Sequence, residues 1–111
     1  MYKYRPTKLE KEYRQQQCEL RYNIDQGKCQ VCGLFRKTLA HRISKSIVNI
    51  KKYGWYIIYH NFNLAIACNG EHNASFNIGM KDIKCQKLIE LINTRGNEKL
   101  TSKFITRYIN E

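Results

Sequence analysis

The sequence has few of the features that mark extended or membrane-bound proteins. It contains a single proline, and no Pro-rich linker, low-complexity tract or internal repeat interrupts the chain. Its longest purely apolar run, Trp55 to Tyr59, is far shorter than the roughly 20 residues of a membrane-spanning helix. Residues 1–6 lack the apolar stretch of a signal peptide. These absences predict a cytoplasmic protein without a membrane partner.

Acidic residues are also scarce. Nine Asp and Glu stand against 20 Lys and Arg, which gives a formal net charge of +11, and no acidic residue lies between Asp25 and Glu71. Phosphate contacts supply sequence-independent affinity for nucleic acids. A segment in which every charged residue is basic therefore predicts a nucleic-acid partner. The alternative is a basic face that only aids solubility. The expected phosphate contacts are Arg36, Lys37, Arg42, Lys45, Lys51 and Lys52.

The chain length limits what can stabilise the fold. The 111 residues suit one domain near the lower end of the usual range, and 42% hydrophobic residues permit a core. A core this small is often supplemented by a metal ion or by disulfides. The five cysteines are odd in number and have no secretory context, which argues against a disulfide framework and leaves metal or redox chemistry.

The pattern of apolar residues predicts an α+β domain. The spacing of Thr7 and Glu10 is that of a helix capping box, and apolar residues recur at helical spacing over residues 8–24, up to Gly27. Two short strands are expected at residues 34–43 and 63–67, on either side of a longer connection. Two more helices should follow. The expected organisation is a single domain with an N-terminal helix (1–26), a core that holds both strands and most of the cysteines (27–80), and C-terminal helices (81–111).

Cysteine and histidine spacing predicts a structural zinc site. Two residues separate Cys29 from Cys32, so a tight turn can direct both thiolates at one ion, and Cys68 with His72 would complete a tetrahedral Cys3His set. A redox role for the CxxC motif is less well supported, because no βαβ pattern surrounds it. The other alternative is that the cysteines are buried small hydrophobes and His72 is a surface residue. Two cysteines are left to pack within helices: Cys18 and Cys85.

The order of these motifs resembles the HNH endonuclease family. A CxxC motif is followed by a strand that carries His41, by an Asn63-Leu64 strand start, and then by Cys68 and His72. The resemblance covers about residues 27–78, and the chain resembles the small phage- and restriction-associated members that carry a zinc site.

What the resemblance implies is a ββα-metal fold and cleavage of double-stranded DNA to 3′-hydroxyl and 5′-phosphate ends. His41 matches the general base, and imidazole suits that role because its pKa lies near neutrality. Asn63 matches the residue that ties the hairpin together. Asn73 and Asn77 match positions that would coordinate a catalytic Mg²⁺ or Mn²⁺. A homodimer would suit a palindromic target.

One position departs from the family pattern. Many relatives have an acidic residue or histidine directly before the general base, where this chain has Ala40. Neutral amide ligands hold Mg²⁺ weakly, so the ion would depend on water and substrate oxygens. Taken singly, His41 is also compatible with a core histidine, Asn63 with a turn residue, and the later asparagines with polar helix positions.

Two other functions stay open on the sequence. A non-catalytic, zinc-stapled nucleic-acid-binding module explains the charge and the cysteines equally well, and Ala40 favours it. A protein–protein adaptor that uses its terminal helices is the weaker rival, and an absence of DNA affinity at low salt would favour it.

Overall fold

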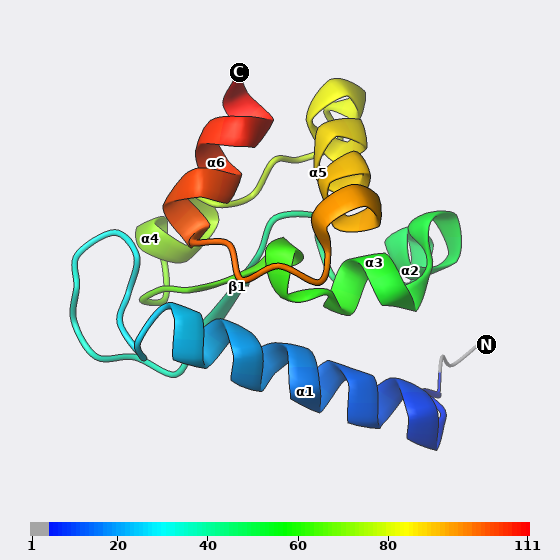
Figure 1. The fold of residues 1–111 in the computed structure, drawn as a ribbon, viewed down its shortest axis with the longest axis horizontal. Helices are drawn as coiled ribbons and strands as arrows, with labels where there is room; N and C mark the ends of the chain where they lie inside the picture. The colour runs from blue at the N-terminus through cyan, green and yellow to red at the C-terminus, as the bar shows by residue number, and fades with distance from the viewer. Residues whose placement is uncertain (1–4) are drawn as a thin grey trace.

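The computed structural model describes residues 5–111, and the first part of the predicted N-terminal segment, residues 1–4, lies outside the described residues. The fold is α+β, mostly helical, with one antiparallel pair of strands (Figure 1). None of the helices within the described residues combines the length and apolarity needed to cross a membrane. The elements are α1 (Lys8–Ile24), β1 (Leu39–His41), α2 (Ile47–Tyr53), α3 (Trp55–Tyr59), η1 (Asn61–Asn63), β2 (Leu64–Ile66), α4 (Glu71–Ala74), α5 (Asp82–Arg95) and α6 (Ser102–Asn110).

Helix α1 has the bounds that its sequence predicts. The Thr7 hydroxyl accepts a hydrogen bond from the Glu10 backbone N–H at 3.2 Å, which satisfies one of the free donors of the first turn. The helix ends where Gln26 and Gly27 both take positive φ angles. Gly27 has a φ of 64°, and a Cβ there would lie 2.8 Å from the Tyr22 hydroxyl oxygen, so glycine is the residue that fits this reversal with least strain.

The two strands are shorter than predicted. β1 and β2 pair over three residues each, with His41 opposite Leu64, whereas the sequence predicts strands at 34–43 and 63–67. Residues 34–37 instead close the loop that carries Cys29 and Cys32, and only Phe35 makes an isolated bridge, to Lys28. Residues 34–37 therefore close this loop and do not extend the sheet.

The connection between the strands contains helices that the sequence analysis missed. Helix α2 begins after Ser46, whose hydroxyl accepts a hydrogen bond from the Asn49 backbone N–H at 3.1 Å. Gly54, at a φ of 94°, separates α2 from the short helix α3. Both helices are brief, seven and five residues, so their apolar residues repeat too few times to give a helical pattern.

Most of the buried apolar residues described in the structure fall into two clusters, and Leu64 and Ile66 of β2 are buried outside both. We call the larger one the helical core; it joins α2 and α3 to α5 and α6 through large side chains. The smaller one, the knuckle core, lies around the strand pair and the cysteine loop. The helical core consists of Ile43, Ile50, Ile57, Ile58, Tyr59, Phe62, Cys85, Leu88, Leu91, Ile92, Leu100, Ile105 and Ile109, and the knuckle core of Cys29, Ala40, Ala65, Ala67 and Phe76.

A buried ion pair connects the end of α1 to the rest of the chain. Arg21 Nη1 lies 3.2 Å from Asp25 Oδ1, and both side chains are inaccessible to solvent. The carboxylate also accepts hydrogen bonds from the Ile66 backbone N–H and the Ser102 hydroxyl. Burial of two charges is tolerated when such bonds satisfy the remaining polar groups. The guanidinium also donates to oxygens of Asn61, Leu100 and Ser102.

Candidate metal centre and the surroundings of His41

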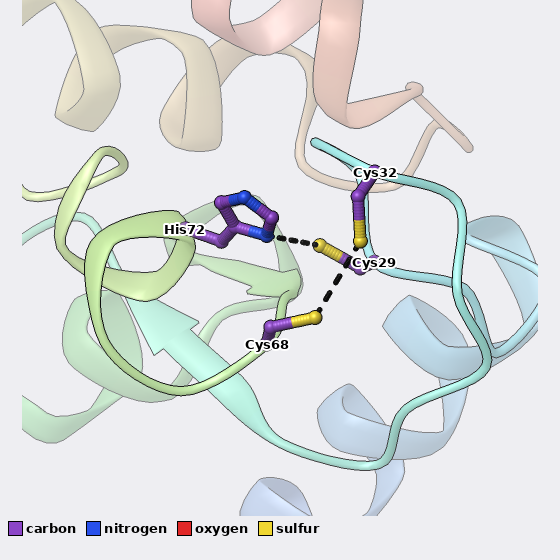
Figure 2. A group of neighbouring side chains, drawn as sticks. All are labelled: Cys29, Cys32, Cys68 and His72. Atoms are coloured by element: carbon purple, nitrogen blue, oxygen red, sulfur yellow. Dashed lines mark hydrogen bonds between the residues drawn. The ribbon is translucent and has the colours of Figure 1, made fainter.

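The four predicted zinc ligands come together in the structure. The three Sγ atoms and a ring nitrogen of His72 all lie within 4.8 Å of one another. Cys29 Sγ is 3.6 Å from His72 Nδ1, and Cys32 Sγ is 3.5 Å from Cys68 Sγ (Figure 2). A Zn–S bond of about 2.3 Å gives ligand separations of about 3.8 Å in a tetrahedron. The cluster is therefore compatible with a structural zinc ion, as the sequence predicts.

Local backbone structure positions these ligands from three segments. In the loop that carries Cys29 and Cys32, the Cys29 N–H donates to the Leu34 carbonyl at 2.7 Å and the Gly33 N–H to the Cys29 carbonyl at 2.8 Å. Cys68 follows β2, and His72 lies in α4. The side chains converge from the loop, the strand end and the helix (Figure 2).

The pKa of the Cys29 thiol is lowered by its surroundings. Burial raises its pKa, but backbone N–H groups of Cys32, Cys68 and Val31 donate toward the sulfur and lower the pKa to about 6. Because a thiolate and not a thiol ligates zinc, the backbone of this loop favours the form that binds the ion.

The imidazole of His41 is half-buried and within electrostatic reach of two cationic side chains. It lies on β1, and burial, followed by the charges of Lys45 and Arg14, lowers its pKa to about 4. The Arg14 guanidinium carbon lies 5.2 Å from the centre of the Tyr59 ring, so this side chain of α1 reaches helix α3 in the connection between the two strands. No hydrogen bond to the His41 ring is found within residues 5–111. His41 is therefore neutral at pH 7 and has free ring nitrogens.

His60 illustrates the contrasting case of a histidine used in the core. Its Nε2 lies 3.1 Å from the Gly96 carbonyl, and its Nδ1 accepts a hydrogen bond from the Phe62 N–H at 3.1 Å. Both ring nitrogens are thus engaged by backbone groups, and burial lowers the pKa to about 4. His60 has the hydrogen-bonded core role that the sequence left open for His41.

Asn63 is buried and holds the chain on both sides of the strand pair. Its Oδ1 accepts from the Ile43 N–H at 2.7 Å, and its Nδ2 donates to the carbonyls of Ile43 and Ile58 at 3.1 and 2.8 Å. The Asn63 carbonyl accepts from the Arg42 N–H at 2.9 Å. These bonds fix the segment that directly follows His41. Asn63 is a positioning residue in this geometry, since its amide is used by backbone groups.

The predicted ligands of a catalytic divalent ion form a poor donor set. Asn73 donates from Nδ2 to the Leu39 carbonyl at 3.3 Å, and Asn77 is exposed, with its Oδ1 accepting from the Gly79 N–H. Ala40, at the position of the acidic ligand in many relatives, is fully buried. Among the described residues, the Cys3His cluster is the one group of three or more His, Cys, Asp or Glu close enough to hold a metal ion. Without a carboxylate, these amides do not fit a resident Mg²⁺.

Most of the predicted phosphate-binding cations are exposed, but one is not. Arg42 is only 2% exposed, and its guanidinium donates to the Phe62 carbonyl, the Thr106 hydroxyl and the Ser102 carbonyl at 2.9 to 3.1 Å. The prediction that Arg42 contacts DNA is therefore wrong, because all three nitrogens are engaged inside the protein. The exposed ones are Arg36, Lys37, Lys45, Lys51 and Lys52.

Arg14 is a candidate site residue that the sequence analysis missed. It lies in α1, outside the segment between the zinc ligands, and the register of α1 against the strands brings its charge to His41 and Cys18. Its i,i+4 spacing from Cys18 shows that the two share a helix face. No sequence pattern relates that face to β1, so the pairing follows only from the tertiary structure.

Comparisons with known proteins add no family assignment. A scan against protein-family models finds no match, and searches of curated proteins and of solved structures find none either.

Proposed function

We propose that this chain is a DNA endonuclease of the HNH kind, in which His41 acts as the general base on a ββα core stapled by zinc. The observation that supports it is the pairing of a neutral, half-buried imidazole with two cations, Lys45 and Arg14, in a chain of net charge +11. Such a site attracts a phosphodiester and provides a base beside it.

In the proposed reaction, a ring nitrogen of His41 accepts a proton from a water molecule whose oxygen attacks phosphorus. The P–O3′ bond breaks, and the leaving 3′ oxygen takes a proton from solvent. The products are a 3′-hydroxyl and a 5′-phosphate end. Asn63 holds the backbone after His41 through Ile43, so the base keeps its position while the substrate binds.

Lys45 and Arg14 have two electrostatic effects in this proposal. Their charges stabilise the negative charge that gathers on the non-bridging oxygens in the transition state. Burial is the main cause of the low pKa of His41; the charges of Lys45 and Arg14 lower that pKa further, and a bound phosphate offsets this second part. The bound substrate therefore raises the basicity of the group that must accept the proton.

The divalent ion that the resemblance implies, Mg²⁺ or Mn²⁺, stays a separate prediction. No step above passes through it, since the side chains near Asn73 and Asn77 do not fit a resident hard cation. Zinc at the Cys3His cluster supplies structure and not chemistry, because four protein ligands leave no open position.

The test is nicking of supercoiled plasmid by the zinc-loaded protein, with and without Mg²⁺ or Mn²⁺. His41→Ala should lower cleavage by a factor of about 100 to 10,000, because a general base is lost. Arg14→Ala should also lower it, whereas Lys11→Ala, an exposed cation on the same helix, should not. Zinc content should stay unchanged in all three variants. Cleavage by His41→Ala at the wild-type rate would refute the assignment.

A second function is favoured by one specific observation. Ala40 leaves the strand pair without an acidic ligand, which suits a zinc-stapled nucleic-acid-binding module that does not cut. That function predicts DNA binding without nicking under every metal condition, and the same plasmid experiment separates the two proposals.

A further inference from the structure

A second basic site lies away from His41. A cavity of about 730 Å³ opens between α6 and residues 75–78, the segment after α4, and α5 contributes one side chain to its wall. Neither His41 nor the two cations beside it line this cavity. Figure 1 shows α6 on the side of the molecule away from α1, which carries Arg14, with α4 between the two.

The charge of this cavity is unbalanced. Lys84, Lys103, Arg107 and the buried Arg42 line it, and no Asp or Glu is among the lining residues. Lys103 and Arg107 are exposed and one helical turn apart on α6, where like charges repel each other. Within the described residues, no ion pair joins Lys84, Lys103 or Arg107 to a carboxylate, whereas the Arg42 guanidinium is already engaged by oxygens inside the protein. A bound anion would relieve this repulsion.

The rest of the wall suits a nucleotide more than a bare phosphate. The volume is within the roughly 300–1,000 Å³ of small-molecule sites and much larger than one phosphate needs. Asn110 brings a side-chain amide, which can both donate to and accept from the edge of a base, and Asn77, whose Oδ1 accepts from the Gly79 N–H, adds its Nδ2 donor. Val31 and Ile78 add apolar surface.

We propose that this cavity binds a nucleotide, with the phosphate at Lys84, Lys103 and Arg107 and the base toward the amides. The same chemistry is offered by a free mononucleotide and by the 5′-phosphorylated end of a DNA strand. The site is independent of the proposed reaction, because His41, Asn63, Lys45 and Arg14 do not line it, and Asn77, which does, has no part in the steps of that reaction.

The test is isothermal titration calorimetry of the zinc-loaded protein without Mg²⁺ or Mn²⁺, so that binding is measured without cleavage. The probes are dAMP, deoxyadenosine, inorganic phosphate, and a short single-stranded oligonucleotide with a 5′-phosphate or a 5′-hydroxyl. The variant Lys103→Ala/Arg107→Ala is compared with Lys11→Ala/Lys99→Ala, which removes two exposed cations elsewhere and matches its net charge. Thermal unfolding and zinc content confirm that both variants fold.

We expect dAMP to bind more tightly than either deoxyadenosine or inorganic phosphate, and the α6 variant to lose about tenfold or more in affinity. The charge-matched control should stay within about twofold. Tighter binding of the 5′-phosphorylated oligonucleotide than of dAMP, lost in the α6 variant, identifies a strand end as the ligand; equal or weaker binding identifies the free nucleotide. No binding of any phosphorylated probe, or equal loss in both double variants, overturns the inference while leaving the plasmid result unaffected.

Discussion

The helical core and the knuckle core are stabilised in different ways. The helical core is built from isoleucine, leucine and aromatic side chains, whereas the knuckle core consists mainly of alanines, with Cys29 and Phe76. Burying a large aliphatic side chain contributes about 1.5–3 kcal/mol, and an alanine methyl group contributes much less. The knuckle core therefore contributes less apolar burial than the helical core, although Leu64 and Ile66 of β2 are also buried. A metal ion at the Cys3His cluster would add stability beside these smaller side chains.

Loss of the metal site should give the largest effect. Cys68→Ser removes one thiolate ligand, and structural zinc can supply about 10 kcal/mol or more of apparent binding energy, which is comparable to the whole stability of a small domain. The variant should contain no zinc and be unfolded or insoluble, as measured by metal analysis and circular dichroism. Cys18→Ser, at a cysteine outside the cluster, is the control and should retain zinc. A well-folded wild-type protein without zinc would refute the inference that a metal ion stabilises the region around the knuckle core.

Truncating a buried side chain of the helical core should lower the free energy of unfolding by less than loss of the metal site does. It should leave the metal site intact. Leu88 is fully buried, so Leu88→Ala should lower the free energy of unfolding by about 2–5 kcal/mol without changing zinc content. Ile83 is 75% exposed on the same helix, and Ile83→Ala should change it by less than about 0.5 kcal/mol. Urea unfolding with parallel metal analysis measures both. Zinc loss in Leu88→Ala would show that the two cores are not separable.

Mild acid should weaken the helical core through His60. Its pKa is lowered to about 4 in the folded chain, mainly by burial, against about 6.5 when unfolded. The unfolded state therefore binds a proton first as the pH falls, and the folded state loses stability between about pH 6.5 and pH 4. From about pH 7 to pH 5.5 the expected loss is about 1 kcal/mol.

The same measurement on His60→Gln separates this effect from the titration of His41 and of the metal ligands. The variant should be less stable at pH 7, because Gln cannot reproduce the bonds to Phe62 and Gly96. It should show a smaller loss on acidification. An equal pH dependence in both proteins would assign the effect to another group.

The smallest expected effect concerns which part of the surface contacts DNA. Lys51 and Lys52 lie on α2 beside the helical core, and Arg36 and Lys37 lie on the cysteine loop. Replacing either pair with alanine should weaken binding and reduce the slope of log affinity against log salt by about 1 to 2, since each phosphate contact releases about one counterion. Fluorescence anisotropy over a salt series measures the slope. An unchanged slope would exclude that pair from the interface.

The features that could be predicted from the sequence are those that repeat or that need a fixed spacing. Helix α1 follows from a cap and a long apolar periodicity, and the Cys3His set from two short spacings. The short helix α3 repeats too few times to be recognised. Charge alone did not separate Arg42, which is buried, from Lys45, which is exposed, and Arg14 reaches His41 only through the packing of α1.

The buried ion pair of α1 sets the order in which the chain can assemble. Arg21 donates to the Leu100 carbonyl, and Asp25 accepts from Ser102, so these partners lie 79 and 77 positions further along the chain. Until Leu100 and Ser102 are in place, docking α1 would bury a charged pair without the bonds that offset its desolvation. During synthesis, therefore, α1 should dock only after the later helix α6 has formed, and contacts of such long sequence separation make that step slow.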